Sequence, residues 1–348
     1  MVGKLPRYRV QKMIKTVALV GNPNAIHAGA HFANAARSLG LQTSVCNSDD
    51  AYVSNLLWRK VNWRLLGHRP ARLNAFSDEV VSVCEQHRPA ALLTTGLAPV
   101  SSRALNRIRR LNISLFNFLT DDPWNRAHRA EWFFDAVPYY DAVFSPRRSN
   151  LDDLKKVGCR AVKYLPFGYA PEIHFPYDGP VEDLGPHRSD VMFAGGADSD
   201  RLPYMSALAE AGLNLALYGN YWDRHSEFRQ SFRGHAGPDL MRKAVAAAKV
   251  CLCLVRRANR DGHAMRTCEL AAMKACMLVE DSDEHREFFG TEGEVVLYFR
   301  SIGEMLSQVK WLIANETERH RLAANVRQRI TSGAHTYADR LKVMIDFG

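Results

Sequence analysis

Short apolar runs of strand length alternate with segments of helical period along most of this sequence. In the first half, strand-like runs extend from TVALVG (16–21) to AVKYLPF (161–167), with helix-like segments between most of them. Such alternation is typical of βαβ units, in which successive strands are parallel and helices cover the sheet. The pattern predicts an α/β protein built on doubly wound parallel sheets.

A second alternating set runs from DVMFAGG (190–196) to EVVLYF (294–299) and is followed by two closing helices. Between the two sets, HFPYDGPVEDLGPHR (174–188) is rich in proline and glycine and has little apolar periodicity, which is typical of a linker. A chain of 348 residues suits two domains at roughly 150 residues each. We expect two Rossmann-like domains facing across a cleft, an N-terminal one over residues 1–178 and a C-terminal one over residues 188–332.

The composition, 47% hydrophobic and 24% charged, is that of a folded globular protein. No apolar run approaches the roughly 20 residues of a membrane span, and the basic N-terminus leads into a short strand pattern instead of a signal peptide. We therefore expect a cytoplasmic protein. The seven cysteines show no paired CxxC spacing, and Cys251 and Cys253 share one face of an apolar strand, so buried thiols are expected.

The formal net charge of +9 comes mainly from the N-terminal half. We favour solvated helical faces as its explanation, with peripheral contact to the inner face of a membrane as the second reading. No nucleic-acid partner is expected, because no helix-turn-helix, zinc finger or RNP-like signature is present. The basic residues concerned are Lys4, Arg7, Arg9, Lys12, Lys15, Arg59, Lys60, Arg64, His68, Arg69, Arg72, Arg107, Arg109 and Arg110.

Ligands of open α/β sheets gather at the carboxyl ends of the strands, where helix N-termini favour anions. In the C-terminal half, Gly195 and Gly196 follow a strand directly and Arg201 opens the next helix. Glycines let a phosphate approach the backbone, and the guanidinium adds a fork of donors. Gly219 and Asn220 end the following strand. A plain tight turn is the commoner explanation of the Gly195–Gly196 pair and an equally good explanation of Gly219 and Asn220.

The segment CLCLVRRANRDGHAMRTCELAAMKA (251–275) combines a strand, a polar loop with Asp261, and a helix beginning near Met265. A carboxylate such as Glu269 suits two ribose hydroxyls, while Arg266 offsets the charge of a diphosphate. The alternative is a simple helical pair between Arg266 and Glu269. The donor-binding candidates here are His263, Ala264, Met265, Arg266, Thr267 and Glu269.

The N-terminal half offers acceptor-side candidates after its strands. Asn22 and His27 follow the first strand, and Asp121 and Asp122 follow another in TDDPWN. Asp122 is expected to contact the acceptor or the transferred sugar, as a base, unless one of these acids instead caps a helix after Pro123. His27 could touch an acceptor hydroxyl or lie on the surface. His27 and His31 lack a visible third ligand, so no metal site is expected.

Several ordered motifs resemble the CgeB-like group of glycosyltransferases, within the group 1 superfamily: TDDP, YDAVFSP, LPFGYAPEIHFP, FAGG with Arg201, LYGNYW, MRTCE and AHTYADR. The resemblance implies a GT-B fold, a nucleotide-activated sugar bound by the C-terminal domain, an acceptor entering from the N-terminal domain, and a C-terminal helix (333–348) that returns to the N-terminal domain. It also implies an E-x7-E element, with Asp261 in its first position and Glu269 as the ribose ligand. Lys274 and Ala275 stand where the family usually has glycines, and Cys268 where an aromatic is common.

The expected function is transfer of a sugar from a nucleoside-diphosphate sugar to a hydroxyl of a carbohydrate or glycoconjugate. We expect no cofactor and no metal, because Arg201, Arg266 and helix N–H groups meet the leaving-group charge. Asp122, Asp261 and Arg266 are the catalytic candidates, and kinship favours retention of configuration. The alternatives are a sugar-nucleotide 2-epimerase and a non-catalytic carbohydrate-binding or assembly protein.

Overall fold

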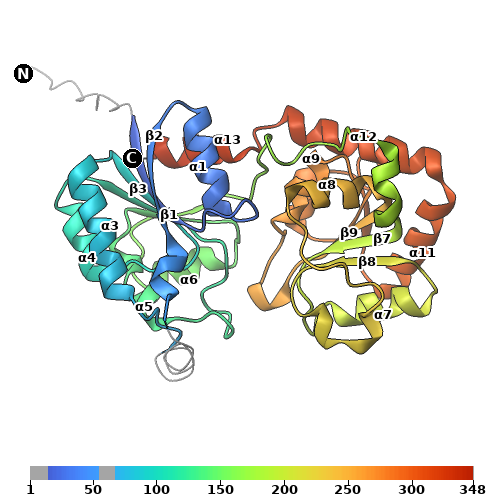
Figure 1. The fold of residues 1–348 in the computed structure, drawn as a ribbon, viewed down its shortest axis with the longest axis horizontal. Coiled ribbons are helices and arrows are strands. Elements are labelled where there is room, and N and C mark those ends of the chain that lie inside the picture. The colour runs from blue at the N-terminus through green and yellow to red at the C-terminus, as the bar shows by residue number, and fades with distance from the viewer. Residues whose placement is uncertain (1–14, 55–66, 348) are drawn as a thin grey trace, which may run out of the picture.

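The computed structural model describes residues 15–54 and 67–347, which form two α/β domains lying side by side (Figure 1). The N-terminal domain contains a six-stranded parallel sheet with the order β2-β1-β3-β4-β5-β6. Its strands are β1 (Thr16–Gly21), β2 (Gln42–Asn47), β3 (Ala91–Thr95), β4 (Ser114–Phe118), β5 (Ala142–Ser145) and β6 (Val162–Tyr164).

Helices cover both faces of this sheet, because successive residues of each buried strand point to opposite sides. Val17 and Leu19 pack with Phe32 on one face, whereas Ala18 and Val20 pack with Phe76 and its neighbours on the other. The helices are α1 (Ala28–Ser38), α3 (Leu73–His87), α4 (Ser102–Arg109), α5 (Glu131–Phe134) and α6 (Asn150–Lys156).

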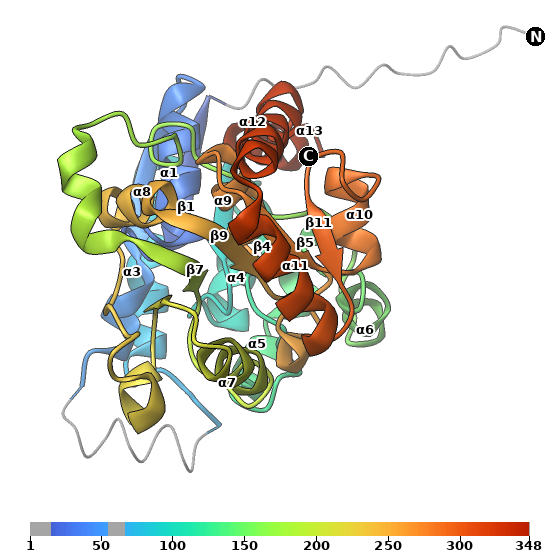
Figure 2. The same cartoon turned by 90° about the vertical axis from the view of Figure 1, so that its right-hand side faces the viewer.

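The C-terminal domain repeats the plan around a five-stranded parallel sheet with the order β11-β10-β9-β7-β8. Its strands are β7 (Ser189–Ala194), β8 (Leu215–Tyr218), β9 (Ala248–Cys253), β10 (Met277–Glu280) and β11 (Leu297–Phe299). Its helices are α7 (Leu202–Glu210), α8 (Pro238–Ala247), α9 (Arg266–Ala272), α10 (Asp283–Phe289), α11 (Ile302–Ala314) and α12 (Glu316–Ser332) (Figure 2). The predicted doubly wound α/β architecture with two sheets is confirmed.

The chain crosses between the domains twice, once through the segment between β6 and β7 and once where α12 leads into α13 (Tyr337–Asp346) (Figure 1). Helix α13 packs on the N-terminal domain, where Tyr337 and Leu341 join the cluster that contains Phe32. The buried Arg340 donates hydrogen bonds to the carbonyl groups of Pro166 (2.7 Å) and Phe167 (3.1 Å). The C-terminal helix is thereby held to the start of the interdomain segment.

Six of the seven cysteines are buried, Cys46 is half-buried, and all seven are free thiols. Cys251 and Cys253 lie in the same apolar cluster, as the strand period predicts. No helix among residues 15–54 and 67–347 combines the length and apolar character that a membrane span requires.

Candidate active site between the two domains

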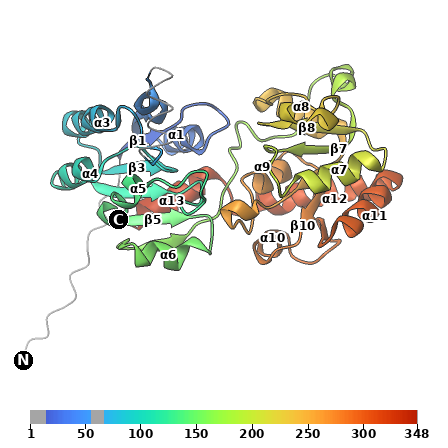
Figure 3. The same cartoon turned by 90° about the horizontal axis from the view of Figure 1, so that it is seen from below.

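Loops at the carboxyl ends of β4 and β5 meet the loop that follows β9, which lies on the side of the C-terminal domain facing the N-terminal one (Figure 3). Arg260 binds Asp122 across this boundary, and the Asn125 amide donates to Asn259 (2.6 Å). These cross-domain bonds bring the carboxyl edges of the two sheets together, and open α/β sheets bind ligands at such edges.

A cavity of about 300 Å³ lies between the domains beside these contacts. Three arginines reach it, Arg147 from the N-terminal domain and Arg201 and Arg266 from the C-terminal domain, together with the carboxylates of Asp121 and Asp261. We call it the donor-side cavity. Its other lining residues are His27, Ala28, Thr120, Phe167, Phe193, Ala194, Gly195, Leu252, Cys253, Leu254, Asn259, Ala264 and Met265.

A second cavity of about 280 Å³, the acceptor-side cavity, lies within the N-terminal domain. It shares His27, Ala28, Thr120 and Asp121 with the donor-side cavity, so the two spaces adjoin. Its polar and aromatic lining suits a carbohydrate, whose hydroxyls need partners and whose ring faces pack on aromatic side chains. That lining includes Asn22, Asp49, Tyr52, His68, His128 and Trp132.

Three of the four predicted acceptor-side residues, Asn22, His27 and Asp121, line this cavity. The Asn22 amide donates to Asp49 (2.8 Å) and so holds one acid of the acceptor-side cavity. Burial lowers the pKa of His27, and the nearby Asp49 and Asp121 oppose that shift. A neutral His27 at the junction of the two cavities can accept a hydrogen bond from a hydroxyl.

The glycine turn after β7 is shaped by its neighbours in the sheet. Arg201 donates to the carbonyl of Gly196 (2.9 Å), and the Trp222 indole donates to the carbonyl of Gly195 (2.7 Å). Gly219 has φ +129°, and a Cβ there would lie 2.6 Å from the Gly195 carbonyl oxygen. Of the predicted donor residues here, Gly195 and Arg201 line the donor-side cavity.

Gly219 and Asn220 differ from the prediction. Neither is among the described residues that line the donor-side cavity, and the Asn220 carbonyl accepts from the backbone of Ala197 (2.8 Å). Their role in the structure is to support the turn that presents Gly195 and Arg201.

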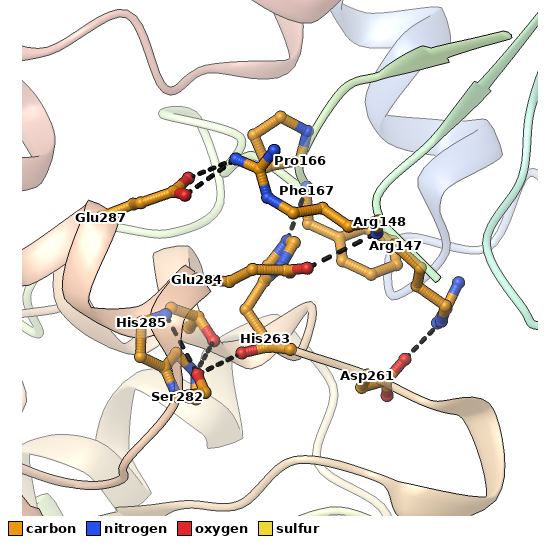
Figure 4. Close-up of polar contacts among 12 residues, drawn as sticks. Arg147, Arg148, Pro166, Phe167, Asp261, His263, Ser282, Glu284, His285 and Glu287 are labelled. Carbon is orange, nitrogen blue, oxygen red and sulfur yellow. Dashed lines mark hydrogen bonds and ion pairs between the residues drawn. The ribbon is translucent and has the colours of Figure 1, made fainter. Parts of the chain in front are cut away.

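The segment that leads into α9 contains both half-buried residues that line the cavity and fully buried ones that do not. Ala264, Met265 and Arg266 line the donor-side cavity. His263 is fully buried; it accepts from the Phe167 amide (3.1 Å) and therefore donates to Glu284 (2.6 Å) (Figure 4).

Thr267 is also buried, between the amide of Ala264 (3.1 Å) and the ring of His285 (3.0 Å). The structure thus turns the side chains of His263 and Thr267 away from the donor-side cavity, and both hold the loop in place. Neither residue lines the donor-side cavity, and the backbone N–H groups of this segment remain the predicted phosphate contacts.

Glu269 is fully buried and forms an ion pair with Arg266, the local alternative foreseen from the helical spacing. Its Oε1 atom lies 3.9 Å from His31 and 3.7 Å from His174. Arg266 separates this carboxylate from the donor-side cavity, because Arg266 lines the cavity and Glu269 does not. Contact with a ribose requires Arg266 to turn toward the ligand.

His31, His174 and Glu269 form a buried group whose donor atoms lie within 4.8 Å of one another. The spacing of His27 and His31 did not reveal this set, because His174 and Glu269 are remote from them in sequence. The ring of His174 accepts from the Ala170 amide through Nδ1 (3.0 Å), so its Nε2 carries a proton. A metal bound through Nε2 needs that atom free. These residues therefore fit a proton-bearing polar cluster better than a metal site.

Asp122 does not face either of the two adjoining cavities in the described residues. It is 1% exposed, and it accepts hydrogen bonds from Asn150 (3.0 Å), the amide of Trp124 (3.0 Å) and Arg260. Among the described residues no helix begins directly after Pro123, and the next one, α5, has Ala130 at its N-cap, so neither acid caps a helix. Its neighbour Asp121 lines both cavities instead.

Arg147 is a cavity residue that the sequence analysis missed. It follows β5 by two residues, donates to the carbonyl of Thr120 (2.8 Å) and forms an ion pair with Asp261 (Figure 4). Burial raises the pKa of Asp261, and the charge and hydrogen bond of Arg147 oppose the rise. The signal in the sequence was an arginine directly after a strand that ends at the cleft.

Three of the described basic residues noted in the sequence pair with acidic side chains. Arg72 pairs with Glu79 (2.8 Å), Arg107 with Glu85 (2.7 Å) and Arg109 with Asp141 (3.8 Å). These pairs are typical of solvated helical faces. The expectation of membrane contact rests on residues outside the described ranges, namely Lys4, Arg7, Arg9, Lys12, Arg59, Lys60 and Arg64.

Comparison with known proteins places this geometry in context. Residues 201–346 match the sequence model of a family described as "Glycosyl transferase-like". Among curated protein sequences, none matches the chain.

Three solved structures cover nearly the whole chain and are nearly wholly covered by it. Sucrose-phosphate synthase from Thermosynechococcus elongatus has a TM-score of 0.68 at 12% identity, covering 95% of this chain and 97% of its own. A glycosyltransferase from Rickettsia africae ESF-5 has a TM-score of 0.64 at 8% identity, and the match covers 96% of this chain and 98% of that one. Anabaena HepE, solved in complex with UDP, has a TM-score of 0.62 at 11% identity, and the match covers 96% of this chain and 99% of that one.

These likenesses identify the two-domain architecture as GT-B, as the resemblance had implied. The family match falls on the C-terminal domain and α13, which contribute Arg201, Asp261 and Arg266 to the donor-side cavity. The chain has the GT-B fold, and its C-terminal part, residues 201–346, matches the glycosyl transferase-like family model.

Proposed function

We propose that the protein transfers a sugar from a nucleoside-diphosphate sugar to a hydroxyl of a carbohydrate or glycoconjugate. The observation that carries the proposal is the donor-side cavity, where three arginines and two aspartates converge between the carboxyl edges of two parallel sheets. A diphosphate brings two or more negative charges, which buried guanidinium groups bind strongly. Anabaena HepE has been solved with UDP-glucose, and its structure matches this chain with a TM-score of 0.65.

Arg201 and Arg266 are the proposed diphosphate ligands, because both come from the C-terminal domain and line the cavity beside the Gly195 turn. In the transfer, the acceptor oxygen bonds to the anomeric carbon while the bond from that carbon to the diphosphate oxygen breaks. The acceptor proton leaves with the departing phosphate or through a neighbouring base. The guanidinium groups stabilise the charge that develops on the leaving group.

Asp121 and His27 are the proposed contacts to the acceptor hydroxyl, because both line the two cavities at their junction. The donor sugar and the acceptor must meet at such a junction for the reacting atoms to approach each other. Asp121 replaces Asp122 in this role.

The adjoining acceptor-side cavity supports transfer over epimerisation. A putative UDP-N-acetylglucosamine 2-epimerase from Listeria monocytogenes shares the fold, with a TM-score of 0.53 at 13% identity. An epimerase consumes its nucleotide sugar without an acceptor and has no need of a second substrate cavity. Product analysis separates the two, since transfer requires a glycosylated acceptor and epimerisation yields an isomeric nucleotide sugar.

The first experiment is a thermal-shift screen with UDP, GDP, CDP, dTDP and ADP, run with and without EDTA. A ligand at about 100 times its Kd stabilises the folded state by roughly 2.7 kcal/mol. We expect a shift with one nucleotide, its loss in Arg201→Ala, and its retention in EDTA. Silence of the wild-type protein with all five would overturn the donor site and favour a non-catalytic carbohydrate-binding role.

Retention of the anomeric configuration is proposed from the resemblance to group 1 enzymes. The product anomer formed from the active donor, followed by NMR in the first minutes of reaction, tests it directly. An inverted product would contradict the proposal.

A further inference from the structure

Arg147 combines deep burial with an unused donor. Its side chain is 2% exposed, yet Nη1 has no hydrogen-bond partner among the residues that the structure describes. The other two nitrogens are occupied, since Nε binds Asp261 and Nη2 donates to the Thr120 carbonyl (2.8 Å). A buried donor without a partner is unfavourable, and such a group on a residue that lines a cavity points to a ligand that satisfies it.

Asp261 offers the complementary atom. Arg147 binds Oδ1 of Asp261, and within the described residues Oδ2 has no hydrogen-bond partner. Both side chains line the donor-side cavity. The unpaired Nη1 of Arg147 and the unpaired Oδ2 of Asp261 therefore belong to two paired side chains (Figure 4), both of which line this cavity.

We propose that Arg147 is a specificity residue for the sugar moiety of the donor, acting with Asp261 on neighbouring hydroxyls of a neutral hexose. The inference rests on the proposed function. One hydroxyl accepts from Nη1 of Arg147, and a second donates to Oδ2 of Asp261, which fits a vicinal diol.

The charge of the pair selects the class of sugar. Arg147 and Asp261 neutralise each other, so a carboxylate on the sugar gains little net attraction and approaches the free oxygen of Asp261. A hydroxyl suffers no such repulsion. The subsite therefore favours a hexose over the corresponding uronic acid.

The pair also explains why this subsite differs from the diphosphate site. Arg201 and Arg266 both belong to the C-terminal domain, whereas Arg147 comes from the N-terminal domain and has its charge matched by Asp261. The subsite is complete when the two domains are together. The sugar moiety of the donor then contacts both domains and helps to hold them together. A nucleoside diphosphate without the sugar does not make these contacts.

The test compares binding of a nucleoside diphosphate and its glucose conjugate by calorimetry, using the nucleotide that the wild-type screen selects. Arg147→Lys keeps the charge but lacks the forked guanidinium. We expect its affinity for the diphosphate to stay within about twofold and its affinity for the glucose conjugate to fall at least tenfold. Equal losses for both ligands, or no loss for either, would overturn the proposal.

Arg148→Ala is the matched control. Arg148 is the next residue and binds Glu287 across the same domain boundary (2.7 Å), but its side chain is half exposed and does not line the donor-side cavity. We expect this variant to bind both ligands as the wild type does. A selective loss of the glucose conjugate in Arg148→Ala would show that any loosening of the boundary produces the effect, and would refute the assignment to Arg147.

Asp261→Asn provides a second readout that does not depend on the folding of Arg147→Lys. It removes the repulsive charge, so we expect the wild-type preference for the glucose conjugate over the glucuronate conjugate to fall at least tenfold. An unchanged preference in a folded variant contradicts the subsite. Absence of nucleotide binding by the wild type would instead mark failure of the proposed function itself, and this inference would fall with it.

Discussion

Arg260 binds the buried carboxylate of Asp122 through two hydrogen bonds, Nε to Oδ2 at 2.6 Å and Nη2 to Oδ1 at 3.0 Å, although the residues are 138 positions apart. The same guanidinium reaches Asp153 (2.7 Å). Asp122 thus joins the domains, and the adjacent Asp121 is the acid that faces both cavities. The two neighbouring carboxylates have separate tasks, and their variants are expected to fail in different ways.

Asp122→Asn is expected to lower the free energy of unfolding by about 1–3 kcal/mol, because it weakens a buried, charge-assisted set of hydrogen bonds. Its kcat should stay within about tenfold of the wild type. Asp121→Asn should keep the stability within about 0.5 kcal/mol but lower kcat by about 10²-fold or more, as for a group acting on the reacting hydroxyl. Denaturant titrations and initial rates measure both. The reverse pattern would restore Asp122 as the acceptor-side acid.

Gly219→Ala is expected to disturb the donor turn from a neighbouring strand. The new Cβ would lie 2.6 Å from the Gly195 carbonyl oxygen, in addition to the strain of φ +129°. Gly212→Ala is the control, because Gly212 has φ +74° with no atom within 4 Å of the added Cβ. Backbone strain of this kind costs about 1–3 kcal/mol. We expect Gly219→Ala to be the less stable variant in chemical denaturation and to lose nucleotide affinity, whereas Gly212→Ala keeps it. Equal affinities would argue against the turn as a donor contact.

Acidification is expected to destabilise the fold through buried histidines. Burial lowers the pKa of His31 to about 4 and that of His174 to about 3, against about 6.5 in an unfolded chain. The unfolded state therefore binds more protons below pH 6.5, and the stability present above that pH is lost as the pH falls toward 4. The slope is about 1.4 kcal/mol per pH unit for each such histidine.

Denaturant titrations between pH 7.5 and pH 4.5 measure this slope. His31→Gln removes one titrating ring, so its stability should depend less steeply on pH by about one proton. A wild-type stability that does not change over this interval would contradict a neutral His31 in the buried group with His174 and Glu269. So would a variant whose stability depends on pH as steeply as that of the wild type.

The architecture was predictable because its signals are local. The alternation of buried positions in TVALVG and VCLCLV can be recognised from neighbouring residues alone, and so can the glycines that follow β7. The structure has strands β1 and β9 at the two runs. The same holds for Gly195 and Arg201, since the carboxyl edge of a parallel sheet is known once its strands are known. The resemblance added the GT-B arrangement, which the periodicity alone does not supply.

The orientation of individual side chains was not predictable in this way. Which of Asp121 and Asp122 faces the cavity depends on Arg260, and which of Arg147 and Arg148 turns inward depends on Asp261, 114 residues from Arg147. His263 was predicted as a donor contact because it lies in the loop between a strand and the N-terminus of a helix. Its partners, the Phe167 amide and Glu284, lie in segments that the local pattern does not connect to it.

Glu269 provides the last prediction, because the fold buries it while the resemblance assigns it to a ribose. If Arg266 turns toward the diphosphate when donor binds, the carboxylate becomes free to accept from the 2′- and 3′-hydroxyls. Glu269→Gln replaces a charged acceptor by a neutral one and should weaken the nucleoside diphosphate about tenfold, equivalent to about 1.4 kcal/mol. The 2′-deoxy analogue lacks one of these hydroxyls, so the wild type should prefer the ribonucleotide and Glu269→Gln should lose much of that preference. Calorimetry with both nucleotides measures the ratio. A variant that is less stable but keeps the wild-type ratio would show that Glu269 only joins Arg266 to His31 and His174, and that the ribose is held elsewhere.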